Sequence, residues 1–578
     1  MTTRQEARDP SEKRGSRRAF LKAGTTASGA LLAQPLLRSI AKAAPTGAPC
    51  TLLKNGLIVD GTGKKGAVGD VLIKGAKIEA VSHSPIKIDC TTVDCTGKVI
   101  APGFIDAHSH MDWLLPIPGR PDLKSPFTAQ GCTTFVAGNC GWAVAGYRKN
   151  SRHKRESRPD LFPEFKIAWD SMAGYFAHLR KVGMSHNLVT MVGQGSTRRS
   201  IRGEDPSPLN PAELKEHLTL LEEAMDQGAW GVSLGLQYSP GIFATPEELK
   251  QVARLVAKKD KILTVHARAY SAVAPGYELK PFGTPHNALA LKEMIDLARE
   301  TGVRVQYSHL IFAGTISHKT YGICLKMIDQ AIADGIDIMF DTYPYHCGNT
   351  GITVVLPKWF REGLPGSYRD PEALKRLRTE IAALSNLVGL GYGDIQITYA
   401  EDPELRQYNG AFLADIAQKR GKAPFEMAME FCQKGGAWVL LHKYSNMEII
   451  EALMKHPAAL FMTDAVPAKW LRNPAGTGSF PLFLQYARDR KLISLEQAVR
   501  KMTGATAERF RIKDRGFLRK GLAADVTVFD YKTVKDNTTL TDYDTPPTGV
   551  EAVFINGEQV KRNGKVDGSV HAGTIVKS

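Results

Sequence analysis

Long hydrophobic runs are scarce in this chain of 578 residues. No stretch beyond the first 44 residues reaches the roughly 18 consecutive apolar residues that a membrane-spanning helix needs. The sequence therefore predicts a protein without an integral membrane segment.

Closely spaced cysteine pairs of the CxxC kind are also missing. The eight cysteines are dispersed along the chain, so neither a disulfide-rich scaffold nor a zinc ribbon is indicated. Cys90 and Cys95 lie near each other in sequence and could form a disulfide if the protein is exported.

Signatures of nucleic-acid binding are missing despite a formal net charge of +16. The basic residues form no run interleaved with aromatic residues, and neither zinc-finger spacing nor an RNA-binding motif is present. The charge suits a basic exported protein or an anionic ligand, and we expect no nucleic-acid partner. The sequence makes no prediction of an oligomeric state.

The first 44 residues have the features of an export signal. Twin arginines, Arg17 and Arg18, precede a weakly apolar stretch rich in Gly, Ala and Thr, and Ala41 and Ala43 supply a small-residue cleavage pattern. This order resembles a twin-arginine signal peptide. We therefore expect a periplasmic or secreted protein.

The middle of the chain alternates short apolar runs with longer amphipathic stretches, which is typical of βα units around a parallel sheet. Eight such runs are present, and eight strands close a (β/α)8 barrel. The runs are VIAPGFID, CTTFVAGN, NLVTMVG, AWGVSLG, ILTVH, VRVQYSH, IDIMFD and ALFMTD.

The two ends of the chain carry strand–turn patterns instead. We expect residues 45–98 and 515–578 to build one small β-sandwich, which leaves residues 99–514 for the barrel. Residues 342–458 separate the seventh and eighth strands, contain helical segments, and are expected to form an insertion or lid over the barrel mouth. The predicted fold class is thus α/β, a TIM-like barrel with a small β domain.

Side chains that can bind metal follow five of the predicted strands. His108 and His110 end the first and point the same way, because side chains alternate along a strand. Each of four other residues ends its own apolar run: Cys140, His266, His309 and Asp464. Since the active site of such a barrel lies at these strand ends, the sequence predicts a catalytic metal centre.

The residue types favour zinc, which takes Cys, His and carboxylate ligands. Cys140, His266 and His309 would hold one tight Zn²⁺, and His108 and His110 a second, weaker divalent ion, where manganese or cobalt could substitute. Asp464 would accept a proton from a water molecule activated by the metal and pass it to the leaving amine.

The chain resembles the amidohydrolase superfamily, and within it the N-acyl-D-amino-acid deacylase (D-aminoacylase) family. The resemblance is carried from about residue 50 to 560 by segments such as VIAPGFIDAHSHMD, GCTTFVAGNCGWA, TVHARAY, VQYSHLIFAG, DTYPYHCGNT, FMTDA and KMTGATAERF. It implies metal ligands at His108, His110, Cys140, His266 and His309, a catalytic Asp464 that also contacts the weaker metal, and a substrate-binding Tyr343.

Three positions depart from that family's pattern. The lysine expected after the sixth strand is Ile311, the arginine expected after the aspartate is Ala475, and a serine is Asn349. The lost lysine and arginine would have bound the substrate carboxylate. Asn349 and Arg268 are candidates for a rebuilt substrate site, although Arg268 could instead pair with a neighbouring carboxylate.

These features together predict a metal-dependent hydrolase of a small-molecule amide, similar to an N-acyl-amino-acid deacylase. A cyclic amide, imide or lactone hydrolase of the same superfamily is the alternative, because both carboxylate anchors are missing. An exported binding protein without turnover is a third possibility. It is disfavoured because a non-enzyme has no need for a full ligand set with an aspartate.

Overall fold

The computed structural model describes residues 49–154, 165–274, 277–278, 280, 283–465, 473–539 and 542–578. The export signal predicted for residues 1–44 lies outside these residues. None of the helices within them is both long enough and apolar enough to cross a membrane.

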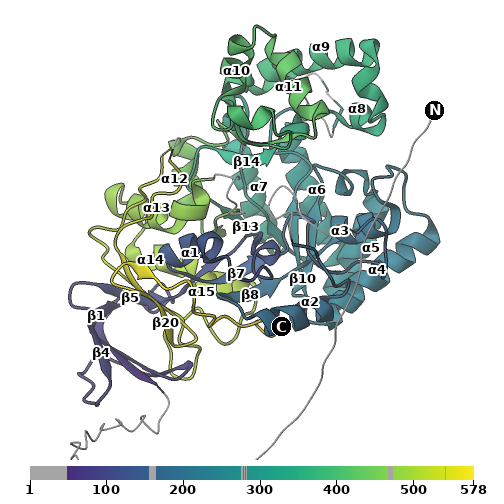
Figure 1. Ribbon diagram of the computed structural model, residues 1–578. Helices are drawn as coiled ribbons and strands as arrows, with labels where there is room; N and C mark the ends of the chain where they lie inside the picture. The colour runs from purple at the N-terminus through teal and green to yellow at the C-terminus, as the bar shows by residue number, and fades with distance from the viewer. Residues whose placement is uncertain are drawn as a thin grey trace, which may run out of the picture. The chain divides into compact units, whose positions relative to one another are not determined.

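Strands from both ends of the chain form one nine-stranded sheet, seen in purple and yellow in Figure 1. Its hydrogen-bonded order is β21-β20-β19-β18-β5-β1-β2-β3, with β4 paired to β1. Leu53, Val71, Val526 and Phe554 meet in its own small apolar core. The strands are β1(Cys50–Ile58), β2(Ala67–Lys74), β3(Lys77–Ser82), β4(Thr91–Asp94), β5(Val99–Pro102), β18(Val526–Phe529), β19(Val550–Ile555), β20(Glu558–Arg562) and β21(Lys565–Val566).

The disulfide in this domain joins Cys50 to Cys90, so the pairing of Cys90 with Cys95 that the sequence allowed does not form. β1 runs parallel to β4 with Thr51 opposite Thr91, which puts Cys50 beside Cys90. Cys95 lies beyond the end of β4, in the domain core, where burial raises the pKa of its thiol to about 12. Strand register, which sequence spacing does not reveal, decides the partner.

Parallel strands form the (β/α)8 barrel. Its ladders run β6-β7-β8 and β9-β10-β11-β12-β13-β17, with β8 and β9 separated by Met191 alone. The outer strands meet where Ala107 N donates to Phe461 O (3.4 Å) and Asp464 N donates to His108 O (3.0 Å). The strands are β6(Phe104–Asp106), β7(Cys132–Ala137), β8(Asn187–Thr190), β9(Val192–Gly193), β10(Gly231–Gly235), β11(Ile262–His266), β12(Arg304–Tyr307), β13(Ile338–Thr342) and β17(Ala459–Phe461).

The predicted first strand, VIAPGFID, is in fact divided between the two sheets. β5 pairs with β1 and β18 in the terminal sheet, whereas β6 pairs with β7 in the barrel. Gly103 separates them and packs against Thr133, where an added Cβ would lie 2.3 Å from the threonine side chain. The close approach explains why the residue at this junction is glycine.

Most barrel helices begin at residues that favour helix starts. Asn210 and Glu213 form a capping box at α4, and Thr245 caps α5, each followed by a proline at the first helical position. The helices are α1(Pro121–Ala129), α2(Met172–Val182), α3(Gln194–Arg202), α4(Pro211–Asp226), α5(Pro246–Lys258), α6(His286–Thr301), α7(Tyr321–Ala333), α12(Met447–Lys455), α13(Ala475–Asp489), α14(Leu495–Met502) and α15(Gly504–Arg509).

The insertion between β13 and β17 has a sheet of its own, of order β14-β16-β15, with both neighbours antiparallel to β16. In Figure 1 it is the part at the top, labelled α8 to α11 and β14. Its elements are β14(Gly348–Gly351), α8(Lys358–Glu362), α9(Pro371–Val388), β15(Ile395–Ala400), α10(Leu413–Lys419), α11(Pro424–Gln433) and β16(Ala437–Leu441). That it moves as a lid stays a prediction.

One buried histidine of the barrel makes stability depend on pH. His217, on α4, is fully buried without a hydrogen-bond partner among the described residues. Burial, with help from Arg198, lowers its pKa from 6.5 to about 3. Between these values the unfolded chain binds a proton that the folded chain does not, so stability falls as the pH falls through this window.

We expect His217→Leu to remove that part of the pH dependence. The free energy of unfolding of the wild-type protein should fall by up to about 1.4 kcal/mol more per pH unit than that of the variant. Urea unfolding of metal-free protein at pH 7, 6 and 5 measures both slopes, and the exposed His83→Leu is the control. Parallel slopes for wild type and His217→Leu would contradict the assignment.

Candidate metal centre

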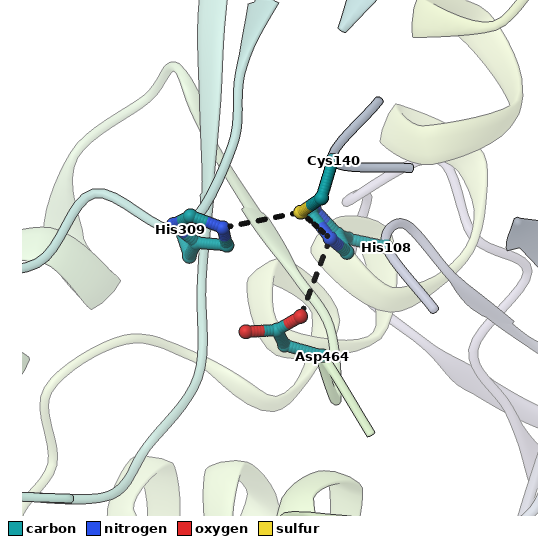
Figure 2. A group of neighbouring side chains, drawn as sticks. All are labelled: His108, Cys140, His309 and Asp464. Carbon is teal, nitrogen blue, oxygen red and sulfur yellow. Dashed lines mark hydrogen bonds and ion pairs between the residues drawn. The ribbon is translucent and has the colours of Figure 1, made fainter. Parts of the chain in front are cut away.

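Four metal-binding side chains meet at the C-terminal ends of the barrel strands. His108, Cys140, His309 and Asp464 follow β6, β7, β12 and β17 and each offers a ligand atom; these atoms all lie within 4.8 Å of one another. Figure 2 shows them turned toward one another. His108, Cys140 and His309 are buried and Asp464 is partly buried.

The sulfur of Cys140 lies between two of the histidines. It is 3.3 Å from Nε2 of His108 and 3.4 Å from Nε2 of His309. Oδ1 of Asp464 lies 3.3 Å from the same His108 nitrogen (Figure 2). One cation could therefore contact several of these atoms after small side-chain adjustments.

The other two predicted ligands adjoin this group. Nε2 of His110 lies 3.4 Å from Oδ1 of Asp464, and Nδ1 of His266 lies 2.9 Å from Nε2 of His309. All six side chains that the sequence singled out thus lie together at the C-terminal ends of the barrel strands.

Three residues of the group have an unusual backbone. Cys140, His309 and Asp464 have φ angles of 57°, 35° and 49°, in the left-handed region that residues other than glycine seldom adopt. Each such residue costs of the order of 1–3 kcal/mol, and such strain concentrates at functional sites. The geometry of these strand ends is therefore held by the surrounding contacts and is not set by local preference.

Asp341 and Asp106 supply some of those contacts, and neither was predicted as a site residue. Oδ1 of Asp341 accepts a hydrogen bond from the backbone N–H of His309 at 2.7 Å and lies 3.3 Å from Nδ1 of His108. Asp106 accepts from Thr463 N (3.0 Å) and from Thr463 Oγ1 (2.6 Å), next to Asp464. Both are carboxylates at strand ends, the same signal that identified Asp464.

Gln237 and Tyr238, which follow β10, were missed as well. Oε1 of Gln237 lies 2.9 Å from Nε2 of His266 and fixes that ring. The hydroxyl of Tyr238 donates to the carbonyl oxygen of Cys140 at 2.5 Å, and its ring lies against His266. Both residues lie just beyond a strand end, and nothing in the local sequence indicates the tertiary contacts that they make.

The electrostatics of the group favour anionic donors. Burial alone would raise the pKa of Cys140, but His108 and His309 outweigh it and hold that pKa well below its ordinary value. Burial would likewise raise the pKa of Asp464, and the same two histidines lower it. A thiolate and a carboxylate beside two imidazoles form a donor set that fits a divalent cation.

Two adjoining cavities open onto this group, with volumes of about 300 Å³ and about 160 Å³. His266, His309, Asn349 and Asp464 are among the residues that line both. Nδ2 of Asn349 is buried without a hydrogen-bond partner among the described residues, so it is free to donate to a bound molecule.

The other two predicted substrate contacts lie differently. Tyr343 is buried, with its hydroxyl under Gly348, where an added Cβ would lie 2.4 Å from it. It therefore supports the strand that carries Asn349. Arg268 forms a bidentate ion pair with Glu293, at 3.2 and 3.1 Å, and donates to Ile242 O. Pairing with a neighbouring carboxylate was the alternative given for Arg268. Because Glu293 already binds its guanidinium, Arg268 is not available to bind the substrate.

Known proteins share both the sequence pattern and the architecture. Residues 91–355 and 402–561 match the amidohydrolase family. A D-aminoacylase from Alcaligenes xylosoxydans xylosoxydans is 30% identical over 91% of this chain and 97% of its own length. An N-acyl-D-glutamate deacylase from the same organism is 28% identical, over 88% of this chain and 92% of its own length.

Solved structures agree with this match. The crystal structure of a D-aminoacylase superposes with a TM-score of 0.76 at 27% identity and covers 91% of this chain and 99% of its own. An N-acyl-D-glutamate deacylase from Bordetella bronchiseptica, complexed with zinc and a phosphonate inhibitor, gives 0.76 at 26%, with 92% and 100% covered. The chain therefore belongs to the amidohydrolase family, in the group that contains the D-aminoacylases.

Proposed function

We propose that this protein is an exported, metal-dependent hydrolase that cleaves the amide C–N bond of an N-acylated amino acid or a related compound. The observation that carries the proposal is the meeting of His108, Cys140, His309 and Asp464 at the barrel mouth, beside two cavities. The relatives named D-aminoacylase and N-acyl-D-glutamate deacylase support the reaction class.

The residues present fit zinc. Cys140, His266 and His309 would hold a tight ion, and His108, His110 and Asp464 would contact a second, weaker one. An ion bound there would polarise the amide carbonyl and lower the pKa of a water molecule. A related N-acyl-D-glutamate deacylase is described with zinc, and a D-aminoacylase with a binuclear metal centre, which supports the proposal.

Asp464 is suited to move the proton. Its lowered pKa keeps it ionised at neutral pH, and its side chain lines both cavities. It can accept the proton that water loses on attacking the carbonyl carbon. It then delivers that proton to the nitrogen as the C–N bond breaks, so the amine leaves neutral.

Export is part of the proposal. The disulfide between Cys50 and Cys90 supports an oxidising compartment, since such bonds are rare in the cytosol. It agrees with the twin-arginine segment seen in the sequence.

The test is elemental analysis of the purified protein, followed by an amide screen with and without chelator. We expect about one tightly bound zinc per chain, hydrolysis of N-acyl-amino acids, loss of activity with chelator and recovery with zinc. Hydantoins, dihydropyrimidines and lactones belong in the same screen, because the alternative is a cyclic amide, imide or lactone hydrolase. A metal-loaded protein that hydrolyses none of these compounds would contradict the proposal and favour a binding protein.

A further inference from the structure

Half of the residues that line the smaller of the two cavities are aliphatic. Ile311 and Val273 come from loops after barrel strands, and Val354, Ile381, Leu384 and Val388 come from the insertion. Ile311 occupies the position at which the sequence pattern of the family expects a lysine. A cavity of this composition favours an aliphatic chain and disfavours a carboxylate.

Among the residues that the structure describes, Arg361, on α8 of the insertion, is the one arginine that lines the larger cavity. Its Nη2 donates to Thr353 O (2.8 Å) and its Nη1 to Gln237 O (3.4 Å), while Nε is buried without an acceptor. Among the described residues no carboxylate lies within ion-pair distance of it. Burial lowers its pKa only to about 10, so it is charged at neutral pH.

An unpaired, largely buried guanidinium is costly unless a ligand supplies the anion. Gln237 connects the Arg361 guanidinium to the metal centre. The carbonyl oxygen of Gln237 accepts a hydrogen bond from Arg361, and the side chain of Gln237 contacts His266. The anion would therefore bind beside the reacting amide. A carboxylate matches the planar fork of arginine best.

We propose that the substrate is an amphipathic amide, an N-acyl amino acid in which a medium-length or long aliphatic chain fills the smaller cavity and a carboxylate binds Arg361. The shared lining residues His266, His309 and Asp464 place the scissile bond between the two parts. This inference rests on the proposed hydrolase function and specifies its substrate class.

Chain length tests the aliphatic half. With the zinc-loaded enzyme, N-acetyl- to N-decanoyl-leucine, in both enantiomers, should show KM falling by about fourfold per added methylene until the cavity is filled. Leu384→Gln should raise KM for the decanoyl substrate about tenfold. Leu387→Gln, on the same helix but 43% exposed, is the matched control and should change nothing. A KM that is independent of chain length would contradict binding of the aliphatic chain in the smaller cavity.

Removing the charge tests the other half. Arg361→Met should raise KM for N-decanoyl-leucine about 10- to 150-fold, with kcat nearly unchanged, and should leave N-decanoyl-leucinamide unaffected. Arg361→Lys should recover part of the loss, and the exposed Arg369→Met is the control. If the Arg361→Met protein does not fold, the ratio of the wild-type KM values for N-decanoyl-leucine and N-decanoyl-leucinamide measures the contribution of the substrate carboxylate instead.

Binding without turnover separates this inference from the function itself. N-Decylsulfonyl-leucine, whose sulfonamide is not hydrolysed, should bind wild-type protein in calorimetry and bind Arg361→Met at least tenfold more weakly. Equal binding by both proteins overturns the role of Arg361. Hydrolysis of amides regardless of chain and charge overturns the substrate class but leaves the hydrolase, whereas no hydrolysis at all removes the proposed function.

Discussion

The Asp464→Asn protein should keep most of its bound metal and turn over its amide substrate about 10²–10⁴ times more slowly than wild type. Asparagine has nearly the same shape, but its amide cannot accept the proton that water loses. The histidines and Cys140 are untouched, so the tight ion keeps its ligands. The predicted loss is therefore in kcat and not in metal content.

Steady-state kinetics and elemental analysis on the same preparation check this result. Asp329→Asn, an exposed aspartate that pairs with His456, is the matched control and should behave as wild type. Wild-type rates in Asp464→Asn would show that another group moves the proton. Loss of the metal together with activity would show instead that Asp464 acts chiefly as a ligand.

The barrel and its small β domain could be predicted because their signals are local. Each strand is a short apolar run. Because the active site of such a barrel lies at the C-terminal ends of its strands, the residues that end these eight runs are predicted to lie close together. This is why His108, Cys140, His309 and Asp464, which lie up to 356 positions apart in the sequence, could be assigned to one site from the sequence alone.

Other features depend on long-range geometry that no local signal carries. Cys50 meets Cys90 because of the register between β1 and β4. The left-handed backbone at Cys140 and His309 is held by partners such as Tyr238 and Asp341, from other strands. These are tertiary contacts, and residue type or periodicity does not encode them.

The substrate site shows the same limit most clearly. The family pattern predicts charged residues at the positions of Ile311 and Ala475, but the sequence alone does not identify what would compensate for them. Arg268 stood near a predicted ligand in sequence and is neutralised by Glu293. Arg361 stands 52 positions after His309, in an insertion without a recognisable motif, and only the fold brings it to the cavity.

Cys140→Ala should weaken zinc binding by at least about 100-fold. Removing a residue that merely orients a metal ligand commonly costs 10- to 100-fold in affinity, so removing an anionic ligand should cost no less. His108 and His309 hold the pKa of Cys140 well below its ordinary value, which favours the thiolate, the form that binds zinc. After dialysis the variant should hold little metal and show little activity, and excess zinc should restore part of that activity.

Cys132→Ala is the matched control for this result. Cys132 begins the strand β7 that precedes Cys140, and burial raises the pKa of its thiol well above the ordinary value, so it stays protonated and binds no metal. Both variants replace a buried cysteine in or just after β7 with alanine. The loss of packing is therefore similar in the two proteins. Competition titration with a zinc-binding dye gives the two affinities. Tight zinc in Cys140→Ala, or equal losses in both proteins, would mean that the Cys140 sulfur is structural and that the histidines hold the ion without it.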